Sequence, residues 1–150
     1  MTPSLEVLGD VDAEIRRKVE SGLAAHVAKE AVPARVVSPL SVVARDENGS
    51  LMGAALGRTV WGWLHVSELW VEESHRRKGI GKSLMVAAEQ AALERGCHAA
   101  YLDTFDFQAV PFYERLGYSV MGTLQDFPLG HVRLFLQKRL DSEDSPNDRR

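Results

Sequence analysis

The stretch from residue 61 to residue 96 constrains the fold more than any other part of the chain. Residues 61–71, WGWLHVSELWV, are rich in aromatic and β-branched residues with apolar side chains on both faces, which is typical of a central strand. Residues 79–95 show helical spacing, and Gly96 supplies the stop. The stripe that we expect this helix to bury consists of Ile80, Leu84, Ala87, Ala88 and Ala91. A strand, a short loop and a helix therefore follow one another directly.

Elements before this unit begin with a short strand, which we expect at residues 4–8. Asp10 or Asp12 then caps a helix that runs to about Glu30. Asn48-Gly49 predicts a hairpin between two strands within residues 40–60, because both turn positions accept positive φ. The helix carries one apolar stripe, formed by Val11, Ile15, Val19, Leu23 and Val27.

Elements after this unit complete a layered sheet. Residues 98–105 read as a strand and residues 109–117 as a short helix. Residues 118–127 and 131–140 read as a final antiparallel pair. The order β-α-β-β-β-α-β-α-β-β predicts a mixed α/β fold.

Composition and charge exclude several classes of protein. The 150 residues predict one domain over residues 1–140, followed by a disordered tail at 141–150 that has no apolar side chain. A net charge of -3 argues against a nucleic-acid partner. Cys97 is the only cysteine and the histidines are dispersed, so we expect no disulfide and no metal. No apolar run suits a signal peptide or a membrane span, so we expect a cytoplasmic protein without a membrane partner.

The loop at residues 72–79 concentrates positive charge beside glycines. Arg76, Arg77 and Lys78 precede Gly79 and Gly81 at the expected start of a helix. Helix N-termini present unpaired N–H groups, and glycine lets an anion approach the backbone, so the pattern fits a phosphate or pyrophosphate cradle. A solvated turn with glycines for tight packing is the alternative. A P-loop is excluded, because its first glycine would fall at Arg76.

Two motifs stand in register along the chain. Residues 76–81 read R-x-x-G-x-G, and Ala109, Phe112, Tyr113, Gly117 and Tyr118 read A-x-x-F-Y-x-x-x-G-[FY]. With both motifs present, the chain resembles the GNAT superfamily of acetyl-CoA-dependent N-acetyltransferases over about residues 5–140. The resemblance is closest to small bacterial members.

This resemblance implies a mixed, mostly antiparallel central sheet flanked by helices. Its fourth and fifth strands, here 61–71 and 98–105, would splay apart and hold the pantetheine arm of acetyl-CoA. Backbone groups of residues 69–71 would serve the pantetheine and thioester, and those of residues 77–82 the pyrophosphate. Arg76 and Arg77 would bind the 3′-phosphate or face solvent, and this choice stays open. The implied cofactor-binding residues are Leu69, Trp70, Val71, Arg76, Arg77, Lys78, Gly79, Ile80, Gly81, Lys82, Gln108 and Phe112.

One position departs from the family pattern. Asp106 stands seven residues before Tyr113, where many members have an asparagine that contacts the cofactor. A carboxylate suits pantetheine less well than an amide does. We therefore expect Asp106 to point away and Gln108 to make the polar contact.

The resemblance makes Tyr113 the general acid that protonates the departing thiolate. A phenol with a pKa of about 10 is protonated at neutral pH and can supply that proton. Packing of Tyr113 into the core is the alternative. Glu68 is the candidate base, with Asp103, His131 and a water chain as rivals, and a structural role for Glu68 is equally open.

The acceptor site is the least determined part. Trp61, Trp63, Phe105, Asp126, Phe127 and His131 are candidates, because aromatic rings with a carboxylate suit a small cationic amine. The tryptophans would otherwise belong to the core or to a dimer face.

The sequence therefore predicts transfer of an acetyl group from acetyl-CoA to a primary amine of a small molecule or peptide, by direct attack on the thioester. An acyl-CoA-binding protein of the same fold without catalysis is the alternative. An RNA-directed protein is a further one, and the net charge of -3 counts against it. A homodimer is compatible with the resemblance.

Overall fold

The computed structural model describes residues 1–141 and divides into two compact units, Met1–Ala34 and the part from Arg35 onward. The first unit contains helix α1 (Ala13–Val27). Its cap is Asp12, whose carboxylate accepts a hydrogen bond from the Ile15 N–H at 2.9 Å. No helix within residues 1–141 is long and apolar enough to cross a membrane. The expectation of one domain stays a prediction, and the expected tail lies, apart from residue 141, outside the described residues.

The short strand expected at residues 4–8 is wrong. These residues belong to no strand, and the first unit offers no second strand with which they could pair. An isolated strand would leave its backbone donors and acceptors unpaired. The apolar stripe of α1 does recur at helical spacing, but Ile15, Val19 and Leu23 are 41%, 55% and 62% exposed.

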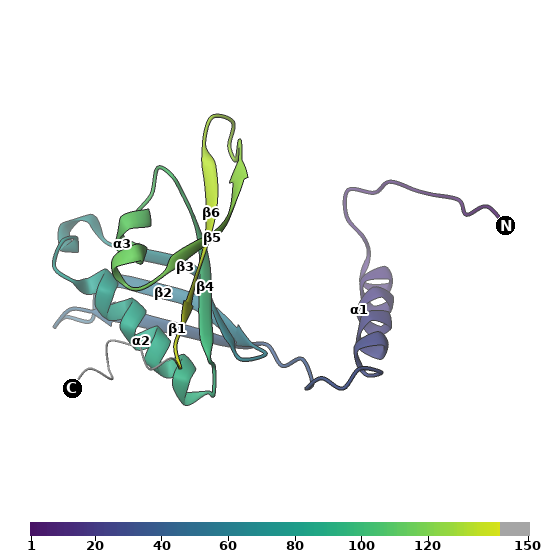
Figure 1. Ribbon diagram of the computed structural model, residues 1–150, viewed down its shortest axis with the longest axis horizontal. Coiled ribbons are helices and arrows are strands. Elements are labelled where there is room, and N and C mark those ends of the chain that lie inside the picture. Colours follow the sequence, from purple (N-terminus) through teal and green to yellow (C-terminus); the bar gives the residue numbers. More distant parts are fainter. Residues whose placement is uncertain (142–150) are drawn as a thin grey trace. The chain divides into compact units, whose positions relative to one another are not determined.

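A six-stranded sheet forms the second unit, with the strand order β1-β2-β3-β4-β6-β5 (Figure 1). Strands β3 and β4 pair in parallel, and every other neighbouring pair is antiparallel. The expected mixed, mostly antiparallel sheet is confirmed, and β3 is central as expected. The strands are β1 (Ser38–Arg45), β2 (Leu51–Val60), β3 (Trp63–Val71), β4 (Ala99–Phe105), β5 (Ser119–Gln125) and β6 (Val132–Arg139), and the helices are η1 (Glu73–His75), α2 (Ile80–Glu94) and α3 (Val110–Arg115).

The β1–β2 hairpin turns at Asn48-Gly49, as predicted. Gly49 has a φ of 81°, and the Asp46 carboxylate accepts hydrogen bonds from the N–H groups of Asn48 and Ser50. The end of α2 also follows the prediction, since Gly96 adopts a φ of 85° immediately after the helix. Local chemistry therefore fixes the turn between β1 and β2 and the end of α2.

The core of the second unit forms where α2 packs on the sheet. The helix contacts β1, β2 and β3 and buries Leu84, Met85, Ala88 and Ala92. Ala87, which the expected stripe included, is exposed, because it lies one residue short of the four-residue repeat that runs through Leu84, Ala88 and Ala92. Leu64, Leu102 and Leu136 supply the facing layer from three adjacent strands and are 0–2% exposed.

A polar network is buried at one side of this core. Glu89 on α2 accepts a hydrogen bond from the Tyr118 hydroxyl at 3.2 Å and pairs with the ammonium group of Lys138 on β6. Burial, followed by the nearby carboxylate, raises the pKa of Tyr118 far above its ordinary range, so the phenol keeps its proton and donates it. The network joins the helix to the C-terminal strands.

Replacement of Lys138 tests how much this network contributes to the free energy of unfolding. Lys138→Met would leave Glu89 nearly buried without its cation, and we expect a loss of about 3 kcal/mol in the free energy of unfolding. The control Arg139→Met removes the same charge from an exposed pair with Asp141 and should cost less than about 1 kcal/mol. Urea denaturation measures both variants. Equal losses would contradict a special role for the buried network.

Candidate active site

The site begins where two parallel strands part. Strands β3 and β4 pair from Trp63 opposite Ala99 to Val66 opposite Leu102. Within the described residues the two strands continue to Val71 and Phe105 without further pairing to each other. The splay that the resemblance implied is therefore confirmed.

A bulge in β3 lies at the point of separation. Leu56 pairs with Glu68 and Gly57 with Val66, so Ser67 is an extra residue on β3. The Ser67 hydroxyl donates to the Leu56 carbonyl at 3.0 Å, which holds the bulge in place. A Cβ on Gly57 would stand 2.2 Å from the His65 carbonyl oxygen, so only glycine fits opposite it. Such a bulge bends the strand and explains why β3 leaves β4 here.

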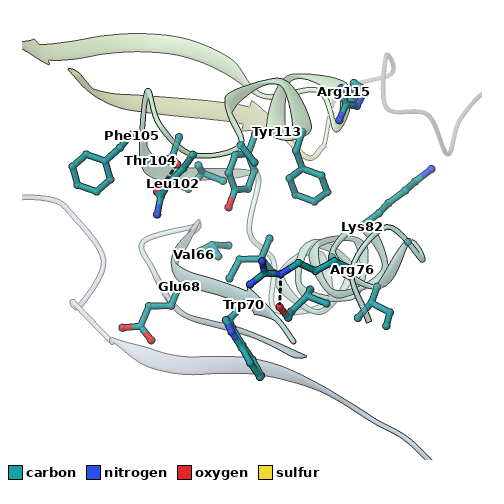
Figure 2. A pocket seen from close by; sticks show the side chains of 18 of the residues that line it. Val66, Glu68, Trp70, Arg76, Lys82, Leu102, Thr104, Phe105, Tyr113 and Arg115 are labelled. Atoms are coloured by element: carbon teal, nitrogen blue, oxygen red, sulfur yellow. Dashed lines mark hydrogen bonds between the residues drawn. The ribbon is translucent and has the colours of Figure 1, made fainter. Parts of the chain in front are cut away.

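A cleft of about 1040 Å³ opens between the separated strands (Figure 2). It is bounded by β3, the cationic loop, the first turn of α2, the end of β4 and helix α3. The residues that line it and were expected to serve the cofactor or the chemistry are Glu68, Leu69, Trp70, Val71, Arg76, Arg77, Gly79, Ile80, Gly81, Lys82, Phe105, Gln108, Phe112 and Tyr113. Of the expected cofactor residues, only Lys78 is not among them.

The cationic loop meets the cleft with its backbone. Arg77 and Gly79 have φ values of 64° and 79°, and α2 begins at Ile80 without a side-chain cap. The first turn of α2 therefore presents its N–H groups at the cleft, as expected of an anion cradle. A Cβ on Gly81 would contact the Phe112 ring at 3.4 Å, so this glycine also allows α2 and α3 to approach.

Positive side chains gather at one end of the cleft. Arg76 lines it and donates from Nε to the Val71 carbonyl at 3.0 Å (Figure 2). Lys82 on α2 and Arg115 on α3 lie at the same end, whereas Glu68 and Phe105 lie at the other. Sequence reasoning missed Arg115. Its signal was weak, since it occupies an unrestricted position of the second motif, two residues after Tyr113.

Tyr113 both packs on the core and lines the cleft. Its ring makes edge-to-face contacts with Phe112 at 5.1 Å and Tyr118 at 6.2 Å and packs on the core. Its hydroxyl points into the cleft, and no residue within 1–141 hydrogen-bonds to it (Figure 2). Burial raises the pKa of Tyr113, which keeps the phenol protonated well above neutral pH.

The candidate bases differ in whether another side chain already pairs with their carboxylates. Glu68 is exposed and lines the cleft. Asp103 also lines it, but Arg133 donates to its Oδ2 from Nε at 2.8 Å and from a second nitrogen at 2.6 Å. His65 lies 3.7 Å from the other oxygen of Asp103, and burial lowers the pKa of His65 although that carboxylate opposes the shift. Asp103 is therefore engaged in an ion pair, whereas Glu68 forms none with any residue of the described part of the chain.

Asp106 and Gln108 lie in different places relative to the cleft, and the expected contact of Gln108 with the cofactor stays a prediction. Asp106 is not among the lining residues, and its carboxylate lies 3.2 Å from Nδ1 of His131. Gln108 lines the cleft, and its Oε1 accepts from the Thr104 hydroxyl at 2.9 Å. This bond leaves the amide N–H groups of Gln108 available to a ligand.

The acceptor candidates separate into two places. Trp63 pairs with Ala99 at the far end of β4 and contacts His98 and Tyr101, so the structure does not bring it to the cleft. Trp61 lies in the turn between β2 and β3.

The other candidates lie near a second hollow of about 360 Å³. Phe105 lines both the cleft and this hollow, and the other residues that line the hollow are Phe107, Asp126, Phe127 and Pro128. The ring centroids of His131 and Phe107 lie 5.1 Å apart in an edge-to-face arrangement. Sequence reasoning missed Phe107.

Comparison with known proteins agrees with this geometry. A profile of the acetyltransferase (GNAT) family matches residues 15–118. The chain is 39% identical to Blasticidin-S acetyltransferase of Streptomyces morookaense over 112 residues, which is 72% of this chain and 82% of that protein. It is 36% identical to Acetyltransferase Atu2258 of Agrobacterium fabrum over 135 residues, which is 89% of this chain and 97% of that protein.

A solved structure shares the fold. The crystal structure of an acetyltransferase from Bacillus cereus superposes with a TM-score of 0.80 and 29% identity, covering 89% of this chain and 97% of that chain. The family profile, the two relatives and this structure are all named acetyltransferases. The chain therefore belongs to the GNAT family and is an acetyltransferase.

Proposed function

We propose that the cleft binds acetyl-CoA and that the enzyme transfers the acetyl group to a primary amine of a small molecule. The separation of β3 from β4 after Val66 carries this proposal. It opens a cleft that has an anion cradle at one end and the Tyr113 hydroxyl in its wall. If the loop were only a solvated turn and Tyr113 only a core residue, there would be no reason for both to line the same cleft.

The cofactor fits the cleft by its chemistry. The N–H groups of residues 80–82 and the left-handed Gly79 suit the pyrophosphate. Beyond Val66 the edge of β3 that faces β4 has no neighbouring strand, so the amides of pantetheine would take that place along Leu69, Trp70 and Val71. Lys82 and Arg115 then lie on opposite helices for the 3′-phosphate.

The transfer itself needs two proton movements. The neutral amine attacks the thioester carbon, and the tetrahedral intermediate collapses with cleavage of the carbon–sulfur bond. Tyr113 gives its proton to the departing thiolate, and Glu68, directly or through water, receives the proton that the amine nitrogen loses. Glu68 is favoured over Asp103 because Arg133 already pairs with Asp103.

A small-molecule acceptor is favoured over a peptide. The relative from Streptomyces morookaense is named for acetylation of blasticidin S, and this chain covers 82% of it. The acidic Glu68 at the end of the cleft away from Lys82 and Arg115 suits an approaching cationic amine.

Amine-dependent release of the CoA thiol tests the function. With saturating acetyl-CoA, a panel of primary amines should release thiol in proportion to enzyme, and mass spectrometry should find the acetylated amine. Acetyl-CoA binding without release by any small amine or peptide would instead indicate a binding protein of this fold. Release with peptides alone would contradict the small-molecule acceptor.

Replacement of Tyr113 tests the general acid. Tyr113→Phe should lower kcat by about 10²- to 10⁴-fold, because the thiolate loses its proton donor, while the Kd for acetyl-CoA changes little. Since burial raises the pKa of Tyr113, the wild-type rate should not fall from deprotonation of this phenol between neutral pH and pH ~10. Steady-state kinetics and calorimetry measure both quantities. The control is Tyr101→Phe, at a ring stacked on His65 outside the cleft lining. A kcat within twofold of wild type for Tyr113→Phe would contradict the role.

Replacement of Arg115 tests the phosphate end. Arg115→Met should weaken acetyl-CoA binding about fivefold, as expected for an exposed charge pair of about 1 kcal/mol. Binding of 3′-dephospho-acetyl-CoA should not change, because it lacks the group that Arg115 meets. Arg139→Met is the charge-matched control, because Arg139 lies on β6 opposite Ala99, at the end of β4 away from the cleft. Equal weakening of binding for both ligands would show that Arg115 does not act on the 3′-phosphate.

A further inference from the structure

The second hollow has walls of flat aromatic rings. Phe105 and Phe107 stack with centroids 5.1 Å apart and an angle of 10°, and Phe127 lies 6.1 Å from Phe105. The hollow is formed where the end of β4 meets the β5–β6 hairpin. Phe107 and Phe127 are 58% and 43% exposed. Large apolar side chains gathered at the surface mark a binding site more often than scattered ones do.

Polar and charged side chains contact these rings. The Arg133 guanidinium lies 4.8 Å from the centroid of Phe127 and is fixed by its ion pair with Asp103. The His131 ring makes an edge-to-face contact with Phe107 and a hydrogen bond with Asp106. The rings therefore need little reorganisation to receive a ligand, which lowers the entropic cost of binding.

The hollow adjoins the cleft at Phe105. Phe105 lines both, and it lies at the same end of the cleft as Glu68, away from Lys82 and Arg115 (Figure 2). Asp126 adds a carboxylate at the rim of the hollow, although its Oδ1 already accepts from the Gly130 N–H at 3.0 Å. An acceptor with a flat apolar group in the hollow and a cationic amine beside Glu68 would therefore span Phe105, the residue that both cavities share.

We propose that this hollow binds an aromatic or heteroaromatic ring of the acceptor, so that the enzyme prefers amines that carry such a ring on a short linker. This inference rests on the proposed function and specifies its substrate class. Phe107 and Phe127 are the residues that set the preference, because Phe105 also belongs to the cleft wall.

Two amines of equal charge and length test the preference. 2-Phenylethylamine and 2-cyclohexylethylamine differ in the flatness and π-electrons of one ring. Calorimetric titration of CoA-loaded enzyme, repeated without CoA, should show tighter binding of 2-phenylethylamine by about fivefold, in line with about 1 kcal/mol for an aromatic pair. Phe107→Leu and Phe127→Leu keep apolar bulk and should abolish this ratio. Leu129→Ala, at an exposed position of the same hairpin and outside the hollow, should retain it.

The outcomes separate this inference from the proposed function. Equal binding of the two amines to wild type, no binding of either, or an unchanged ratio in both leucine variants would overturn the ring site. The acetyltransferase proposal would still stand if other amines released thiol. Failure of CoA to bind would contradict the proposed function, and the titration without CoA would still measure the ring preference.

Discussion

The loss of hydrogen bonding between β3 and β4 after Val66 is the constraint on which the site depends. Two parallel strands that stay paired leave no space between them, whereas these separate at the Ser67 bulge opposite Gly57. Unpaired strand edges must find other partners in water or in a ligand. The proposed pantetheine arm would be such a ligand, and the other elements of the second unit line the cleft around that position.

The two ends of the cleft carry opposite charges. The first turn of α2, Lys82 and Arg115 make one end positive, and Glu68 lies at the other beside Phe105. Tyr113 faces the space between them from α3, anchored by Phe112 and by Tyr118, which belongs to the buried network with Glu89 and Lys138. The buried network and the position of the Tyr113 phenol are thus connected through adjacent side chains.

Local signals in the sequence predicted the parts that short-range chemistry determines. Asn48-Gly49, Gly96 and the cationic loop each fixed a turn or a helix end without help from distant residues. Arg115, Phe107 and the remote position of Trp63 needed the three-dimensional register, because strand pairing decides which end of β4 a β3 residue meets. The Ser67 bulge likewise depends on the opposing strand. Residues 4–8 had strand composition but no partner within their unit.

Thermal unfolding with acetyl-CoA, with ATP as control, tests the central claim most directly, because it reports occupation of the cleft without requiring an acceptor. Ligand at 100 times its Kd should stabilise the protein by about 2.7 kcal/mol, a rise in Tm of about 5–10 °C for a domain of this size. A rise with acetyl-CoA and none with ATP is the predicted result. No rise at millimolar acetyl-CoA would contradict the cofactor assignment, and the roles given to Tyr113 and Glu68 would fail with it.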